Sequence, residues 1–289
     1  MVVQFGAHAF IWAAEWSPAG AKTVISGAAR AGLDFVEIPL LHPGEFDVDS
    51  TRQLLEAHGL GCTTSLGLPA NVHLPFNPNG AQQFLIEAVD VSAQIGSPLL
   101  TGCVYTHLGT LTRKPPTEEE LATVARVLKV VARHAATYDM RLGIEPVNRY
   151  ESYLINLAAQ GLQMLERIDE PNVFLHLDTY HMNIEEKGFD QPIAAAGAHL
   201  GYIHLSESDR GIPGTGNVHW DQVFDGLRQI HFDEYLVMES FAAVNEDLIG
   251  STAIWRDLVG DPQKLVTDGL AFLRTKAQEY GLGPTPAES

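Results

Sequence analysis

Residues 141–178 have the sequence RLGIEPVNRYESYLINLAAQGLQMLERIDEPNVFLHLD. The segments 141–147 and 173–178 within it are short and largely apolar, and turn-forming residues bound them, which is typical of strands buried on both faces. Residues 157–168, between the two segments, are predicted to form a helix. The stretch therefore predicts a strand, a helix and a second strand.

The same unit recurs along most of the chain at an interval of about 36 residues, the chain length divided by eight. We predict strands at residues 3–9, 35–40, 61–66, 99–104, 141–147, 173–178, 200–205 and 235–240. We predict helices at residues 19–31, 49–58, 81–94, 118–138, 157–168, near Pro192, 220–229 and 262–280. Thr117 followed by three glutamates is a helix-start signal, and Gly32, Gly59 and Gly281 follow helical runs as helix-end signals.

Strict alternation implies a parallel sheet with right-handed crossovers, and eight repeats predict an α/β fold of one (β/α)8 TIM barrel. We expect the barrel to span residues 1–282, with a frayed tail at 283–289. A doubly wound open sheet is the alternative, but no glycine-rich phosphate loop follows the first strand. The glycines of residues 211–218, GIPGTGNV, follow the seventh strand and indicate a mobile loop.

Composition excludes several classes of protein. The chain has 289 residues, of which 45% are hydrophobic and 19% charged, so it can bury a large core. Its net charge of -18 disfavours nucleic-acid and membrane-surface partners, because both carry negative charge. The first residues show no basic segment ahead of an apolar run, so we expect a cytoplasmic protein. Cys62 and Cys103 lie in apolar segments and are predicted to be reduced core thiols.

Polar residues finish four consecutive predicted strands. Glu145, Asp178, His204 and Glu239 are separated by 33, 26 and 35 residues, about one strand–helix unit each. Active sites of TIM barrels form at the carboxyl ends of the strands, so closure would bring these four side chains together. Three carboxylates and an imidazole suit a divalent ion such as Mn2+. The alternative is four ordinary strand-end residues, but that arrangement would bury much negative charge without a counterion.

Four segments together resemble the ketose 3-epimerases, a family that acts on D-tagatose, D-psicose (allulose) and L-ribulose and belongs to the xylose-isomerase-like TIM barrel superfamily. The resemblance covers nearly the whole chain. Its motifs are specific in combination and weak singly. They are EPVNRYE at 145–151, DTYHMN at 178–183, HLSESDR at 204–210 and VMESF at 237–241.

The resemblance implies a role for each matching residue. Glu145, Asp178, His204 and Glu239 would bind the metal. Their donor types lead us to expect Mn2+, with Co2+ or Mg2+ as alternatives. Glu145 and Glu239 would also exchange the C3 proton of a free ketose through a metal-stabilised enediolate. Glu151, His181 and Arg210 would bind the sugar. The family also implies a homodimer or homotetramer.

Several further residues have open roles. Glu37 is expected at the end of the second strand, either near a sugar hydroxyl or in a structural hydrogen bond. His176 is either a neighbour of the metal ligands or a core histidine, and neither His8 nor the Trp12–Trp16 stretch matches the family motifs clearly. Residues 241–259, FAAVNEDLIGSTAIWRDLV, are too long for an ordinary loop and are predicted to cover the pocket, to bury apolar residues in a second subunit, or to fold back on the barrel.

Two rival classes of function remain at the level of sequence. One is another metal enzyme on this barrel, either an aldose–ketose isomerase or an apurinic-site endonuclease, the latter opposed by the charge of -18. The other is a non-catalytic sugar-binding protein, which would not need two glutamates on the metal.

Overall fold

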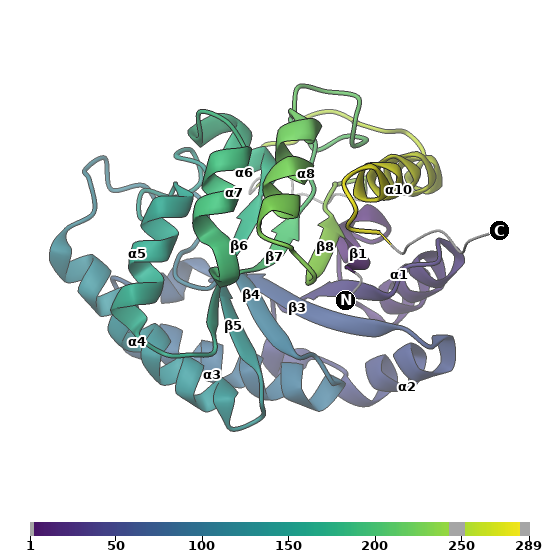
Figure 1. Cartoon of the computed structure of the whole chain (residues 1–289). Coiled ribbons are helices and arrows are strands. Elements are labelled where there is room, and N and C mark those ends of the chain that lie inside the picture. Colours follow the sequence, from purple (N-terminus) through teal and green to yellow (C-terminus); the bar gives the residue numbers. More distant parts are fainter. Residues whose placement is uncertain (1–2, 243–251, 284–289) are drawn as a thin grey trace.

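The computed structural model describes residues 3–242 and 252–283, in which eight parallel strands close into a barrel in chain order. In Figure 1 the helices form an outer ring around these strands. The strands are β1 (Gln4–His8), β2 (Phe35–Pro39), β3 (Gly61–Gly67), β4 (Leu99–Cys103), β5 (Arg141–Ile144), β6 (Val173–Asp178), β7 (Leu200–His204) and β8 (Tyr235–Met238). The main helices are α1 (Pro18–Arg30), α2 (Val48–His58), α3 (Pro78–Ile95), α4 (Glu118–Ala136), α5 (Ala158–Ile168), α6 (Thr179–Glu185), α7 (Asp190–Ala196), α8 (Trp220–Gln229) and α10 (Pro262–Glu279).

The predicted (β/α)8 barrel is confirmed, and each predicted strand overlaps an observed one. The barrel closes where β1 pairs with β8, in the register Gln4 to Tyr235. Short 3-10 helices add turns after β1, β2 and β3 and before β7: η1 (Ala9–Ile11), η2 (Pro43–Glu45), η3 (Ala70–Val72) and η4 (Gly197–His199). Residues 284–289 lie outside the described residues, so the frayed tail stays a prediction.

Among the described residues, helix α6 is the α-helix that the sequence did not predict. It starts directly at the end of β6, where the Asp178 carboxylate caps it by accepting a hydrogen bond from the Tyr180 N–H at 2.7 Å. His181 therefore lies in the first turn of a helix. At seven residues, α6 is too short to show a helical period, and no spacer separates it from the strand.

The predicted helix boundaries at Thr117 and at three glycines are confirmed. Thr117 accepts a hydrogen bond from the Glu120 N–H at 3.2 Å, and the Glu120 carboxylate accepts one from the Thr117 N–H at 2.7 Å. Gly32, Gly59 and Gly281 have φ of +65°, +64° and +73°, a region in which glycine meets no steric penalty.

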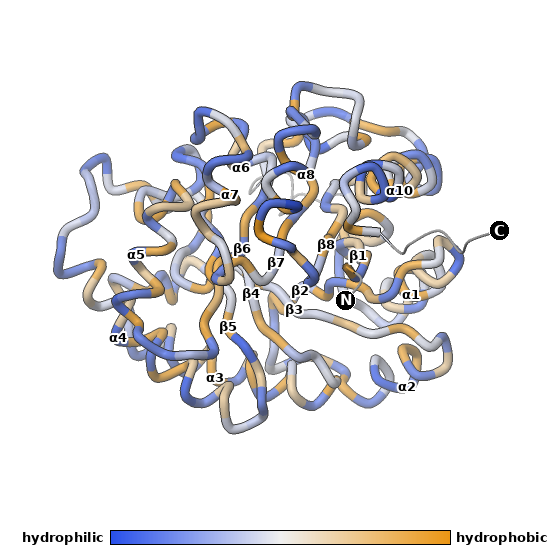
Figure 2. Tube along the Cα trace, in the orientation of Figure 1, coloured by the Kyte–Doolittle hydropathy of each residue, from blue (hydrophilic) through white to orange (hydrophobic). Residues whose placement is uncertain are grey.

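Apolar residues fill the space between the strands and the helices. A second apolar cluster fills the interior of the barrel toward the amino ends of the strands. In Figure 2 hydrophobic and hydrophilic residues alternate along the outer helices, as expected for helices with one buried side. The interior cluster contains Phe35, Leu99, Phe174, Tyr202 and Val237. Both cysteines are buried and unbridged, as predicted. Among the described residues, no helix is long and apolar enough to cross a membrane.

Gly143 makes room for the ring of Phe174. A Cβ at Gly143 would lie 2.1 Å from Thr101 Oγ1 and 2.6 Å from that ring, closer than atoms can approach. The small residue on β5 and the large one on β6 thus fit as a pair. The ring of Phe174 and the other members of the interior cluster thus fill the barrel toward the amino ends of its strands.

We expect Phe174→Ala to lower the free energy of unfolding by about 3–5 kcal/mol, since it empties a site that is only 1% exposed. Phe76→Ala is the matched control, because the Phe76 side chain is 60% exposed and its loss should change stability by about 0.5 kcal/mol or less. Urea denaturation of both variants measures the difference. Equal midpoints for the two would contradict the assignment of Phe174 to the core.

Candidate active site

The structure brings Glu145, Asp178, His204 and Glu239 together at the carboxyl end of the barrel. Asp178 and His204 are the last residues of β6 and β7, while Glu145 and Glu239 directly follow β5 and β8. All four are buried. The Nδ1 atom of His204 lies 3.7 Å from Glu145 Oε1, 3.8 Å from Asp178 Oδ2 and 3.4 Å from Glu239 Oε2. One imidazole nitrogen therefore faces three carboxylates.

The donor set fits a divalent cation. Ligand atoms of Asp178, His204 and Glu239 lie within 4.8 Å of one another, and Glu145 forms similar groups with its own neighbours. The Nδ1 atom of His204 is buried and has no hydrogen-bond partner. Buried polar atoms are almost always paired, so an unpaired nitrogen aimed at carboxylates indicates that a cation belongs there. This cluster can bind a divalent metal.

Burial and mutual repulsion perturb the acidic groups. Burial raises the pKa of Glu145 well above its usual value, and the nearby charges of Asp178 and Glu239 add to the rise. Burial also acts to raise the pKa of Asp178 and Glu239, but the Arg210 guanidinium holds both below their usual range. The cluster therefore depends on neighbouring positive charge.

Arg210 supplies such a charge from the loop after β7. Its Nη1 donates hydrogen bonds to Asp178 Oδ2 at 2.6 Å and to Glu239 Oε2. The guanidinium also lies over the ring of Tyr180, 4.0 Å from the centroid. Arg210 has φ of +64°, an uncommon conformation for a residue other than glycine. The surrounding loop must therefore hold the backbone in place.

Glu207 is the residue that holds this loop. Its buried carboxylate accepts hydrogen bonds from the N–H groups of Gly214 at 2.9 Å and Val218 at 3.1 Å, and from Trp220 Nε1 at 3.1 Å. The glycine-containing loop that we predicted to be mobile is thus anchored at three points. Sequence reasoning did not select Glu207, although it stands in the HLSESDR motif.

His181 and Glu151 are joined through Asn148. The His181 Nδ1 atom accepts a hydrogen bond from the Asn148 N–H at 3.2 Å, and Asn148 Nδ2 donates to Glu151 Oε1 at 2.8 Å. His181 Nε2 lies 3.7 Å from Glu145 Oε1 and 3.4 Å from Arg210 Nη2. The three predicted sugar-binding residues are therefore neighbours of the acidic cluster or linked to it. Asn148 was missed, although it lies inside the EPVNRYE motif.

The structure also places the residues whose roles the sequence left open. Glu37 lies in the middle of β2 rather than at its end, and it is fully buried inside the barrel, where its Oε2 accepts a hydrogen bond from His204 Nε2 at 2.7 Å. His8 lies on the other side of this carboxylate, with its Nε2 3.5 Å from Glu37 Oε1. The His176 ring packs edge-on against His204 with centroids 4.2 Å apart, and its Nδ1 is hydrogen-bonded to Thr101 at 3.0 Å. Glu37 and His176 therefore contact His204 directly, and His8 lies next to Glu37.

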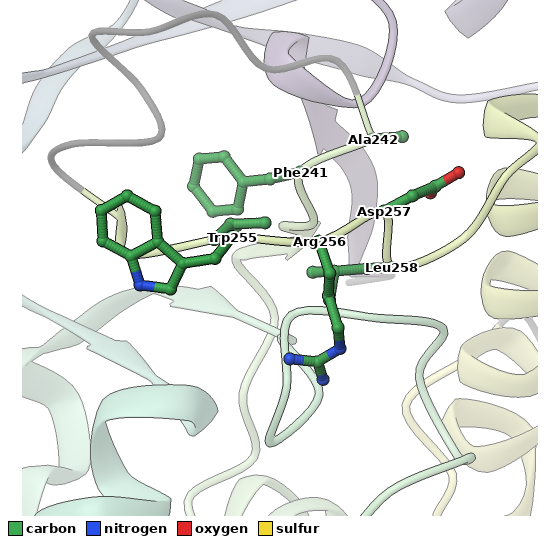
Figure 3. Close-up of a pocket in the computed structure, with 7 residues that line it drawn as sticks. Phe241, Ala242, Trp255, Arg256, Asp257 and Leu258 are labelled. Atoms are coloured by element: carbon green, nitrogen blue, oxygen red, sulfur yellow. The ribbon is translucent and has the colours of Figure 1, made fainter.

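The predicted insertion is described at its two ends only, because residues 243–251 lie outside the described part. Phe241 and Ile254 pack against Phe10 of the same chain, so this portion folds back on its own barrel. Trp255, in contrast, is 76% exposed. Phe241 and Trp255 are among the residues that line a pocket here, as Figure 3 shows. The volume of this pocket is about 250 Å³.

Comparisons with known proteins agree with the fold and identify relatives. Residues 25–276 match the family model of the xylose isomerase-like TIM barrel. The chain is 39% identical to an L-ribulose 3-epimerase of Methylomonas sp. (strain DH-1) over 95% of this chain and 98% of that protein. It is 35% identical to a ketose 3-epimerase of Arthrobacter globiformis over 95% of this chain and 96% of that protein. A crystal structure of a D-allulose 3-epimerase from Methylomonas sp. in complex with D-allulose superimposes with a TM-score of 0.92 at 38% identity, covering 95% of this chain and 97% of that one.

A closed eight-stranded barrel with an acidic cluster at its carboxyl end, together with the match over residues 25–276, defines the broad class as the xylose isomerase-like TIM barrels. Within that class the chain belongs to the ketose 3-epimerase family, as its motifs suggested, and it is an enzyme of the carbohydrate epimerase class.

Proposed function

We propose that this enzyme is a metal-dependent ketose 3-epimerase that inverts C3 of a free ketohexose or ketopentose, of the D-tagatose, D-psicose/D-fructose or L-ribulose type. One observation carries the proposal: three buried carboxylates surround the unpaired Nδ1 of His204. The names of the relatives, which include L-ribulose and ketose 3-epimerases, support the choice of substrate class. The acidic charge of -18 fits a small neutral substrate better than an anionic polymer.

Glu145, Asp178, His204 and Glu239 would hold the metal, for which we propose Mn2+, with Co2+ or Mg2+ as alternatives. Carboxylate oxygens together with one imidazole nitrogen suit these ions better than they suit soft, thiolate-binding metals. When bound, the ion would supply Lewis-acid stabilisation of the negative charge that develops on the ketose oxygens.

Glu145 and Glu239 would move the proton. One carboxylate removes the proton from C3, and the electron pair of the C–H bond passes into the C2 carbonyl to give an enediolate. The other carboxylate delivers a proton to C3 from the opposite face, so protons lost and gained balance. Their positions favour this division, because β5 and β8 stand three strands apart on the ring while both carboxylates lie within 3.7 Å of the same imidazole nitrogen.

His181, Arg210 and Glu151 would orient the sugar. Since His181 Nδ1 is bonded to the Asn148 backbone N–H, Nε2 is the nitrogen that faces the acidic cluster and would meet a sugar oxygen. Arg210 places a buried cation beside the same acidic cluster, and Glu151 offers a carboxylate that can accept hydrogen bonds from sugar hydroxyls. The two unbridged thiols fit the cytoplasmic location that we propose.

The first test is removal of the metal. Chelation should abolish epimerisation and lower the melting temperature, because an ion bound only by the folded protein stabilises it by mass action. Epimerisation of a panel of ketoses, followed by chromatography with Mn2+, Co2+ or Mg2+ restored, measures recovery and identifies the preferred pair. Full turnover by protein proven free of metal would refute the proposal, and an aldose product would indicate an isomerase instead.

The second test replaces the two proton-transferring carboxylates. Glu145→Gln and Glu239→Gln should each lower turnover by about 10²-fold or more, since the amide keeps the shape of the side chain but cannot accept the proton. Exchange of the C3 hydrogen with deuterated solvent, followed by NMR, monitors the step directly. A Gln variant that holds metal and exchanges at the wild-type rate would exclude that glutamate as a base.

The third test separates sugar binding from metal binding. Glu151→Ala and His181→Ala should lose catalytic efficiency while retaining one bound metal ion per chain, because neither side chain is among the proposed ligands. Arg210→Ala should behave in the same way. Steady-state kinetics and metal analysis on the same samples test this expectation. Loss of the metal in any of the three variants would show that the replaced residue is needed for metal binding.

We also propose a homodimer, or a homotetramer built from dimers, with Trp255 in the interface. A tryptophan 76% exposed beside a cavity is a common feature of protein interfaces. Sedimentation at micromolar concentration should show a species heavier than 31.5 kDa, and Trp255→Glu should dissociate it. Ile254 is unsuitable for this test, since it packs inside its own chain.

Val130→Glu, on the exposed side of α4, is the control and should leave the assembly intact. A wild-type monomer would contradict self-association, and an unchanged oligomer in the Trp255 variant would place the interface elsewhere.

A further inference from the structure

Glu37 is a buried carboxylate that belongs to neither the proposed ligands nor the proposed sugar-binding residues. It lies on β2, on the inside of the barrel, and is 0% exposed. Its Oε2 accepts hydrogen bonds from His204 Nε2 at 2.7 Å and from the Tyr202 hydroxyl at 2.8 Å. Its Oε1 lies 3.5 Å from His8 Nε2. An isolated buried carboxylate is unfavourable, so these partners must account for its presence.

The neighbours of Glu37 all approach it as donors. His8 Nδ1 accepts a hydrogen bond from the Phe10 N–H at 3.2 Å, so the His8 proton lies on Nε2, the atom that faces Glu37. The Tyr202 hydroxyl is also hydrogen-bonded to Thr63 at 2.7 Å, which leaves Tyr202 free to donate to Glu37 when Thr63 donates to it. His204 and Tyr202 thus both donate to Oε2, while the protonated Nε2 of His8 faces Oε1 at 3.5 Å, without a hydrogen bond. A glutamine amide that kept its oxygen toward His204 and Tyr202 would turn its N–H groups toward the N–H of His8, so a carboxylate suits this position.

This arrangement determines which nitrogen of His204 is available. An imidazole that donates from Nε2 has its lone pair on Nδ1, and Nδ1 is the atom that faces Glu145, Asp178 and Glu239. Without a strong acceptor behind Nε2, the proton would be drawn to the three carboxylates in front, and Nδ1 could not bind a metal. The Glu37 carboxylate at Nε2 therefore determines whether Nδ1 of His204 has a free lone pair for a metal ion.

We propose that Glu37 is a positioning residue, which holds His204 in the Nε2-protonated form and in the orientation that lets Nδ1 bind a divalent ion. The inference rests on the proposed function, since it concerns the metal site of that reaction. Tyr202 and His8 act one step further away, by fixing the Glu37 carboxylate. In metal sites of known proteins, loss of such a partner typically weakens metal binding by about 10- to 100-fold.

The decisive variant is Glu37→Gln, studied beside Glu234→Gln. Glu234 precedes β8 at the opposite end of the barrel, where it pairs with Arg141 at 2.9 Å, so the control makes the same chemical change far from the site. Mn2+ titration followed by electron paramagnetic resonance should show a dissociation constant raised about 10- to 100-fold for Glu37→Gln and unchanged for Glu234→Gln. The visible spectrum of the Co2+-loaded protein should change only in the Glu37 variant. Wild-type affinity and an unaltered spectrum in Glu37→Gln would overturn the inference.

A second measurement needs no folded variant of Glu37. Nitrogen-15 NMR of the Mg2+-loaded wild type, with the His204 signals assigned by their loss in His204→Gln, should show a proton on Nε2 and none on Nδ1. A proton on Nδ1 would overturn the inference even if Glu37→Gln fails to fold. Wild-type protein that binds no Mn2+ would contradict the proposed function as well, whereas binding equal to that of Glu37→Gln would contradict this inference alone.

Discussion

The repulsion among three carboxylates buried at one end of the barrel is the constraint on which the rest of the site depends. Glu145, Asp178 and Glu239 would be unstable together in a low-dielectric interior without opposing charge. Arg210 supplies part of that charge through hydrogen bonds to Asp178 and Glu239. The unpaired Nδ1 of His204 marks where a further cation fits. The neighbouring residues are arranged to keep these compensating groups in place.

Three polar residues next to the site each hold a different part of it in place by hydrogen bonds. Glu207 anchors the loop that carries Arg210, and Asn148 joins His181 to Glu151. Glu37 accepts from the far nitrogen of His204. The ring of Phe174 and its neighbours fill the barrel on the amino-end side of these residues, so the polar network packs against a close-packed apolar cluster. The site is therefore held from the side by loops and from beneath by packing.

The sequence predicted the barrel and the acidic cluster because both depend on local signals. A buried parallel strand is a short apolar run, and an acid at its end is visible without any knowledge of its partners. Helix α6 escaped because seven residues joined to a strand show no period of their own. The role of Glu37 escaped for a different reason: its partner His204 lies 167 residues away, and no local pattern reports a contact at that distance. Asn148 shows the same limit, since its partner His181 is 33 residues away.

Closure of the barrel between β1 and β8 has a consequence for how the protein is made. The register that joins Gln4 to Tyr235 also carries Glu239 to the site, so the first and last strands must meet before the acidic cluster is complete. During synthesis, Glu145 and Asp178 leave the ribosome well before Glu239 does. A nascent chain thus holds only part of the cluster until nearly all of the barrel has been translated, and contacts of such long sequence separation form slowly. Barrel closure and completion of the acidic cluster are therefore late, coupled events in the folding of this enzyme.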